Sequence, residues 1–171
     1  MKDKKSLKVG NKIVDFGQVY RIFKIEKQKR AKGKEETVIF FRPYFKTKQN
    51  RTLICSIPVN NIKKTKIRRP ISKKELRKLL KELSQKSDIE IPINITRAKE
   101  MLNLNDPHEI VRILKSLWLE KNDKSTSFTK TREKVLRLAI KRLVEEVALV
   151  NNMSIEKAKR QMEEALEKGT K

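Results

Sequence analysis

The hydrophobic residues follow two different periods along the chain, and the period changes near residue 70. Before that point, short apolar runs rich in β-branched and aromatic residues are separated by polar turns, a pattern typical of β-strands. Strands are predicted over Lys12–Val14, Val19–Glu26, Thr37–Arg42 and Thr52–Ile57. Four or five short strands of this kind indicate a small, strongly bent antiparallel sheet or an open barrel.

After residue 70 the apolar residues recur at the spacing of an α-helix. Ser72 and Glu75 form a capping box, in which the serine oxygen and the glutamate satisfy free amide hydrogens at a helix start. The leucines behind it keep the helical spacing: Leu76, Leu79, Leu80 and Leu83. A second, shorter helix is predicted from Thr96 to Leu104.

Asp106 and Pro107 give the strongest helix start in the chain, because aspartate is a good N-cap and proline suits the first helical position. Its apolar stripe is Ile110, Leu114, Leu117 and Trp118, so Trp118 is predicted to be a core residue. A long helix follows, opened by Thr129 or Thr131 and ending near Asn151, with Val135, Leu138, Leu143 and Val147 inward. Ser154 caps a last helix that carries Ala158, Met162 and Leu166.

These elements predict an α+β protein, with a small β module followed by an all-α bundle of four or five helices. We place the domain boundary at the basic stretch between them, which gives domains of residues 1–67 and 68–171. That stretch, Lys63–Arg69, is either a solvated linker or a strip that faces phosphates.

Charge adds a partner to this picture. The chain has a net charge of +23, and the surplus of basic over acidic residues is 16 in residues 1–70 but only seven in residues 71–171. A protein this basic repels itself unless it meets a polyanion, so nucleic acid is the leading candidate partner. A generally lysine-rich proteome would raise the charge without any binding site, and this alternative stays open.

Catalytic chemistry is not predicted. The chain has one histidine, His108, in the first turn of a helix, and one cysteine, Cys55, in an apolar run, where we expect a buried structural thiol. The carboxylate pairs Glu145–Glu146 and Glu163–Glu164 are predicted to face solvent on helices. Neither metal-ligand spacing nor a Gly-rich phosphate loop is present, so we expect no enzyme, no metal and no cofactor.

No sequence-reading or membrane device is evident either. There is no helix-turn-helix with a basic second helix, and the β half lacks the aromatic sheet motif of the common RNA-binding fold. No run of about 18 apolar residues occurs, and the start has no apolar leader stretch. We therefore expect a cytoplasmic protein that contacts backbone or groove shape rather than base sequence.

A series of fragments, in the right order and spacing, resembles the CarD/CdnL family of bacterial transcription regulators. In the β half, Leu7–Val14 resembles the family's opening "F-x-x-G-D-x-V-V", and Ile25–Glu26 with Lys32–Gly33 resembles the strand and turn that come next. Leu53–Asn61 resembles the family's "I-P-V-x-N" strand end, and Ile67–Ser72 resembles the "G-V-R" segment between the two domains. In the helical half, Asn105–Trp118 resembles "S-G-D … V-V-R-D-L-W", and Phe128–Ala148 the long "E-K-x-M-L … L-x-x-E-L-A" helix. The resemblance covers nearly the whole chain.

The resemblance implies a Tudor-like N-terminal domain that docks on the RNA polymerase β subunit by strand-edge pairing. Family arginines that face the polymerase fall here on Gln28 and Ser56, and nearby cations could replace them. The implied polymerase-binding residues are Lys27, Gln28, Lys29, Arg30, Arg51 and Ser56.

For the helical domain, the resemblance implies binding to promoter DNA at the upstream edge of the transcription bubble. There the family inserts a tryptophan into the minor groove, and our alignment puts Ile95 at that position, as an apolar wedge or a plain core contact. DNA-backbone contacts are expected from the cations around two helix starts: Arg97, Lys99, Lys130, Arg132 and Lys134.

Three functions follow as hypotheses. The first is a monomeric regulator that binds RNA polymerase and promoter DNA together and stabilises the open complex. The second is a basic RNA- or ribosome-associated protein, which the charge and the Tudor-like fold both allow. The third is a protein-docking module whose helical half binds another factor instead of DNA.

Overall fold

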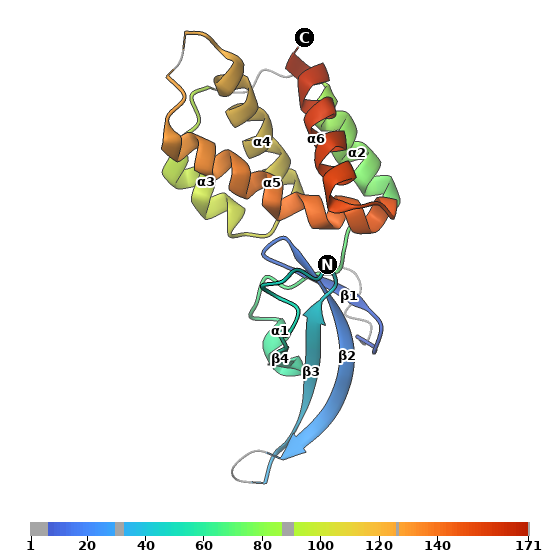
Figure 1. Cartoon of the computed structure of the whole chain (residues 1–171). Helices are drawn as coiled ribbons and strands as arrows, with labels where there is room; N and C mark the ends of the chain where they lie inside the picture. The colour runs from blue at the N-terminus through green and yellow to red at the C-terminus, as the bar shows by residue number, and fades with distance from the viewer. Residues whose placement is uncertain (1–6, 30–32, 87–90, 126, 171) are drawn as a thin grey trace. The chain divides into compact units, whose positions relative to one another are not determined.

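A computed structural model of the chain describes residues 7–29, 33–86, 91–125 and 127–170, and Figure 1 shows its elements. These residues divide into two compact units, Met1–Pro70 and Ile71–Lys171. The first is a β-sheet unit and the second is helical, so the predicted α+β class is confirmed. Arg68 belongs to the β unit, because its backbone pairs with that of Val14.

The β unit is one antiparallel sheet in the order β1-β2-β3-β4. Its strands are β1 (Lys12–Asp15), β2 (Gln18–Lys29), β3 (Glu35–Pro43) and β4 (Cys55–Pro58). Phe16 and Gly17 join β1 to β2, and both have positive φ, 45° and 77°. This is the backbone of the tight turn whose twist matches that of a hairpin, so the short first hairpin forms in spite of the phenylalanine.

One face of the sheet carries the core of this unit, which consists of Ile13, Tyr20, Ile22, Ile39 and Phe41. The rings of Tyr20 and Phe41 meet edge-on, 5.2 Å apart. A β-bulge lies between Ile22 and Lys24 on β2. A bulge bends its strand and increases the local twist, so it produces the curvature that the sequence pattern predicted.

The last strand differs from its prediction. It begins at Cys55 instead of Thr52, and the residues before it, Leu53 and Ile54, are 43% and 62% exposed. Cys55 is half-buried instead of buried, and partial burial raises the pKa of its thiol. A short helix that was not predicted, α1 (Val59–Ile62), follows Pro58 directly.

The helical unit contains α2 (Lys73–Ser84), α3 (Ile95–Leu102), α4 (Pro107–Asn122), α5 (Lys130–Asn151) and α6 (Ile155–Thr170). The predicted N-caps are confirmed, since Ser72 accepts the Glu75 amide hydrogen at 3.1 Å and Asp106 accepts that of His108 at 2.9 Å. Of the capping box only the serine half is seen, because the Glu75 carboxylate lies 3.3 Å from His108. Thr129, and not Thr131, is the N-cap of α5. In the part of the chain described, no helix is long and apolar enough to cross a membrane.

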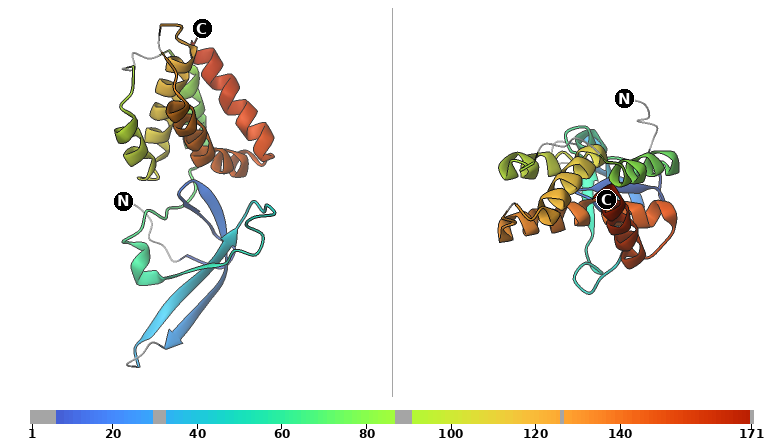
Figure 2. Two further views of the ribbon diagram at one scale, coloured as in Figure 1. Left: turned by 60° about the vertical axis from the view of Figure 1, so that its left-hand side comes forward. Right: turned by 90° about the horizontal axis from the view of Figure 1, so that it is seen from above.

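Helix α2 packs against α6, and α5 packs against both α4 and α6; Figure 2 shows these helices from two further directions. One predicted solvent-facing carboxylate is wrong: Glu146 is fully buried and accepts the backbone N–H of Ile71 at 2.7 Å. Its position on the inner face of α5 means that it fixes the start of the helical unit, whereas Glu163 and Glu164 remain at the surface.

At Gly169, α6 approaches the backbone at the end of α2 closely. A Cβ added there would lie 2.6 Å from the carbonyl oxygen of Leu83. We expect Gly169→Ala to destabilise the helical unit by about 1–2 kcal/mol, because overpacking costs more than alanine's better helix propensity returns. Urea unfolding followed by the fluorescence of the single tryptophan measures this. Lys168→Ala, at an exposed neighbour, is the control, and equal stability of the two variants would contradict the prediction.

Candidate nucleic-acid interface

Two helix starts in the helical unit are built in the same way. Asn94 caps α3 by accepting the amide hydrogen of Arg97 at 3.0 Å, and Thr129 caps α5 by accepting that of Arg132 at 3.4 Å. A capped helix start still leaves amide hydrogens free and carries a partial positive charge. Each start can therefore receive a phosphate.

A buried ion pair brings the two starts together. Glu120, near the end of α4, is 1% exposed and pairs with the guanidinium of Arg132 on α5. Glu120 also accepts the backbone N–H of Ile93 at 2.5 Å, and the guanidinium donates to the carbonyl oxygen of Ile93 at 3.2 Å. Both backbone polar groups of Ile93, two residues before α3, are thus bound to this pair. Figure 1 shows α3 and α5 side by side accordingly.

The predicted DNA contacts fall into two groups. Four cations at the paired helix starts are exposed, and no ion pair joins them to a carboxylate within the described residues: Arg97, Lys99, Lys130 and Lys134. Arg132 differs, because its side chain is 20% exposed and its guanidinium points inward to Glu120. Ile95, the expected wedge, is the first residue of α3 and is half-buried.

The sequence reading missed one exposed apolar residue at this site. Ile91 is 36% exposed and lies on the segment that leads to the Asn94 cap. Pro92 follows it, and a residue before proline is disfavoured in a helix. The proline after Ile91 therefore indicates from sequence alone that Ile91 lies in the loop before α3 and not on the apolar face of a helix.

The neighbouring pair of α4 and α5 is tied by Glu133. Its carboxylate lies 3.1 Å from Arg137 and 3.6 Å from Lys121, and these cations, Arg137 first, lower its pKa. The ammonium of Lys121 also lies 5.8 Å from the ring centroid of Trp118. Trp118 is half-buried, so it is a boundary residue of the helical unit and not the core residue expected.

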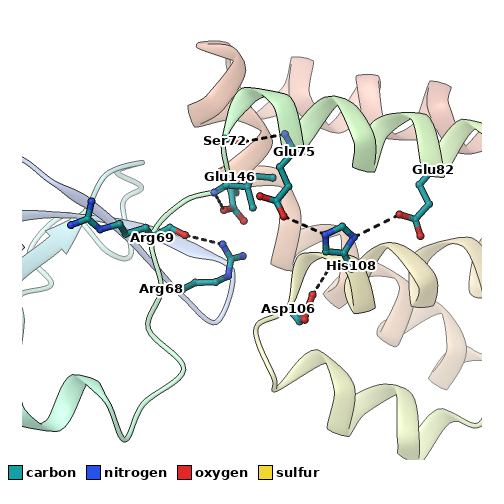
Figure 3. A network of polar contacts seen from close by, with 9 residues as sticks. Arg68, Arg69, Ser72, Glu75, Glu82, Asp106, His108 and Glu146 are labelled. Atoms are coloured by element: carbon teal, nitrogen blue, oxygen red, sulfur yellow. Dashed lines mark hydrogen bonds and ion pairs between the residues drawn. The ribbon is translucent and has the colours of Figure 1, made fainter. Parts of the chain in front are cut away.

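His108 lies at the surface, as predicted, between two carboxylates of α2 (Figure 3). Its Nε2 is 3.3 Å from Glu75 and its Nδ1 is 3.8 Å from Glu82. The contacts join the start of α4 to α2. In the described residues no group of three or more His, Cys, Asp or Glu side chains is arranged to hold a metal ion.

In the β unit, strand β4 is a sheet edge. The described residues pair it only with β3, whereas the outer side of β1 is bridged by Arg68 through hydrogen bonds of 2.8 and 3.1 Å with Val14. The exposed Leu53 and Ile54 directly precede β4. An edge of this kind is a template for another strand.

The sheet register shows on which face of the sheet each expected polymerase-binding residue lies. Ser56 lies opposite Phe40, and Gln28 lies opposite Glu36, so alternation along β3 puts Ser56 and Gln28 on one face. It is the face opposite the core residues, and we call it the outer face. By the same alternation Lys27 and Lys29 point the other way. Arg51 is exposed in the turn before β4, and Arg30 lies outside the described residues.

Two aromatic rings on this outer face were missed. Phe23 and Phe40 are half-buried, with ring centroids 6.5 Å apart. Arg42 lies over the ring of Phe23 at 5.2 Å, and Lys24 lies over that of Phe40 at 5.3 Å. The bulge at Ile22/Lys24 shifts the alternation, which is why the sequence pattern alone did not place Phe23 here.

A family model of the CarD C-terminal domain matches residues 75–163, more than half of the chain. The chain belongs to the CarD family. No curated protein shows significant similarity to the chain. CarD proteins are non-enzymatic transcription factors, so the function of this chain is associated with transcription. The match spans α3, α4 and α5, and therefore contains the paired helix starts and the Glu120–Arg132 pair.

Proposed function

We propose that this CarD-family protein binds RNA polymerase through its β unit and promoter DNA through its helical unit, and so stabilises the open complex. The observation that carries the proposal is the pairing of two helix starts with the exposed cations Arg97, Lys99, Lys130 and Lys134. They supply charge and amide hydrogens to a phosphate backbone without any base code. The protein acts as a monomer in the cytoplasm.

The groove contact is assigned to an apolar residue at the mouth of α3. Ile95 is the position implied by the family resemblance, and Ile91 is the more exposed of the two. An exposed apolar side chain beside phosphate contacts can enter a minor groove at an unstacked base step. We therefore assign the contact to Ile91 and a supporting packing role to Ile95.

Alanine variants separate the two isoleucines. Ile91→Ala should shorten the open-complex lifetime roughly thirtyfold, because about 2 kcal/mol of apolar contact is lost, and should leave the melting temperature unchanged. Ile95→Ala should lower the melting temperature instead. If only Ile95→Ala shortened the open-complex lifetime, Ile95 would be the residue that enters the groove.

For the polymerase, we propose that a strand of the β subunit adds to the free edge of β4. Main-chain hydrogen bonds would supply the affinity, and Ile54, Ser56 and the outer face would contact the partner's side chains. Ile54→Asp, which places a charge beside this edge, tests the contact. It should abolish capture of the polymerase β subunit, while Val9→Asp, another exposed apolar position of the β unit, should not.

Two measurements test the whole proposal: capture of the β subunit and the lifetime of open complexes with and without the protein. Binding together with a longer lifetime supports it. Absence of β-subunit binding and an unchanged lifetime would reject it.

A second candidate function is favoured by the outer face. Phe23 and Phe40, with Arg42 and Lys24 over their rings, combine the aromatic and cationic groups that bind single-stranded RNA. An RNA- or ribosome-associated protein would co-sediment with ribosomes, and RNase would release it. RNase-insensitive behaviour with intact polymerase binding favours the first function.

A further inference from the structure

The Glu120–Arg132 pair, which joins α4 to α5, is also hydrogen-bonded to the loop before α3. One oxygen of Glu120 accepts the Ile93 amide hydrogen, the other receives Arg132, and Arg132 donates to the Ile93 carbonyl. Burying two charges costs about as much free energy as their attraction returns, so such a pair is a poor source of stability. What it does provide is one fixed geometry for Ile93.

That geometry controls three groups of the candidate interface. Ile91 lies two residues before Ile93, and the Asn94 cap lies directly after it. On α5, Arg132 turns inward, and residues two positions away on a helix point to roughly the opposite side. Lys130 and Lys134 therefore point outward, in agreement with their exposure.

We infer that Glu120 and Arg132 are positioning residues, which hold the segment of residues 91–94 against α5 so that the α3 and α5 starts bind one DNA backbone together. This inference rests on the proposed DNA-binding function. Arg132 thereby acts through Ile93 and not through a phosphate of its own, which changes the role expected from the sequence.

Charge and position predict opposite results for Glu120→Gln. If Glu120 acted only by charge, removing a negative group would strengthen binding to a polyanion. Glutamine instead keeps one acceptor oxygen for two donors, the Ile93 N–H and the Arg132 guanidinium, and its NH2 group faces one of them, so the site is loosened. We expect the affinity for forked promoter DNA to fall roughly tenfold, since small displacements of binding groups have effects of this size. The slope of log affinity against log salt should stay unchanged, since no phosphate contact is removed.

Arg132→Lys is the second test variant. It keeps the positive charge but loses the planar fork that binds Glu120 and the Ile93 carbonyl together. A positioning role predicts weaker binding with an unchanged salt slope, whereas direct phosphate contact by Arg132 predicts nearly normal binding. Exchange of the Ile93 amide hydrogen should become faster in both variants, which reports the loosened segment directly.

The double variant Glu120→Met with Arg132→Met is the control for correct folding, because an apolar pair can replace a buried ion pair without loss of stability. It should melt near the wild-type temperature and bind forked DNA weakly. Wild-type affinity in Glu120→Gln and Arg132→Lys would overturn the inference. Failure of the wild-type protein itself to bind DNA would be a distinct result, which overturns the proposed function and the inference with it.

Discussion

Replacing Lys115 by methionine is expected to destabilise the helical unit by about 2–4 kcal/mol, the largest effect of any single substitution considered. Lys115 lies on α4 and is 5% exposed. Its ammonium donates to the carbonyl oxygens of Glu82 and Gln85, each at 2.8 Å, at the end of α2. Methionine fills a similar volume but leaves both carbonyls without this donor, and it removes the positive charge that favours a helix C-terminus.

Urea unfolding of the full chain, followed by Trp118 fluorescence, measures the loss. Lys121→Met on the same helix is the matched control, since Lys121 is exposed and its ion pair with Glu133 is worth at most about 1 kcal/mol. Equal midpoints for the two variants would show that the carbonyls at the end of α2 do not need Lys115.

The pH dependence of the same variant has a defined sign. Burial lowers the pKa of Lys115 below its ordinary value of 10.5, partly offset by the charge of Glu82. Between the lowered pKa and 10.5 the unfolded chain binds more protons than the folded one, so wild-type stability rises with pH there. The stability difference between wild type and Lys115→Met should therefore widen as the pH is raised from neutrality toward 10.5. A stability difference that became smaller as the pH rose would show that the pKa of Lys115 is not lowered in the folded protein.

The helices could be predicted because their signals are local. Ser72, Asp106 and Thr129 bond to amide hydrogens two or three residues away, so a short stretch of sequence contains the whole cap. The stripes behind them hold for the same reason. The strands were less exact, because the bulge on β2 and the exposed Ile54 depend on pairing between strands that sequence periodicity does not contain.

The buried carboxylates could not be predicted. Glu120 bonds to Ile93 and Glu146 bonds to Ile71, and the sequence between these partners contains whole helices. On a helical wheel each glutamate resembles a surface residue, since a charge is rarely buried without a partner. Only the folded arrangement supplies that partner, and for this reason Arg132 was predicted to face DNA when its guanidinium faces Glu120.

Net charge predicts a polyanionic partner but does not locate its site. The larger surplus, 16, lies in residues 1–70, whereas the proposed DNA contacts lie in the helical unit, where the surplus is seven. Position matters more than total charge, because cations that are already paired add little to a phosphate contact. Lys121 is paired with Glu133, whereas Arg97 and Lys130 are exposed without an ion pair among the described residues.

Removing the four exposed cations of the paired helix starts is expected to have the largest effect on DNA binding. The variant replaces Arg97, Lys99, Lys130 and Lys134 by alanine. Each phosphate contact contributes about 0.9 to the slope of log affinity against log salt, so the slope should fall by up to about 3.6 and the affinity at low salt by orders of magnitude. Fluorescence anisotropy of labelled promoter DNA over a salt series measures both quantities.

The control removes the same charge elsewhere in the helical unit. Lys157, Lys159, Arg160 and Lys168 are exposed on α6, which packs against α2 and lies away from α3 in Figures 1 and 2. Their replacement by alanine should change the slope by less than about one, the value of a single phosphate contact. If both variants lost the same slope, binding would depend on net charge alone and the paired helix starts would not be the DNA site. If neither variant changed the salt slope, the helical unit would be a docking surface for another protein. The cations at the starts of α3 and α5 would then contact an acidic surface of that protein.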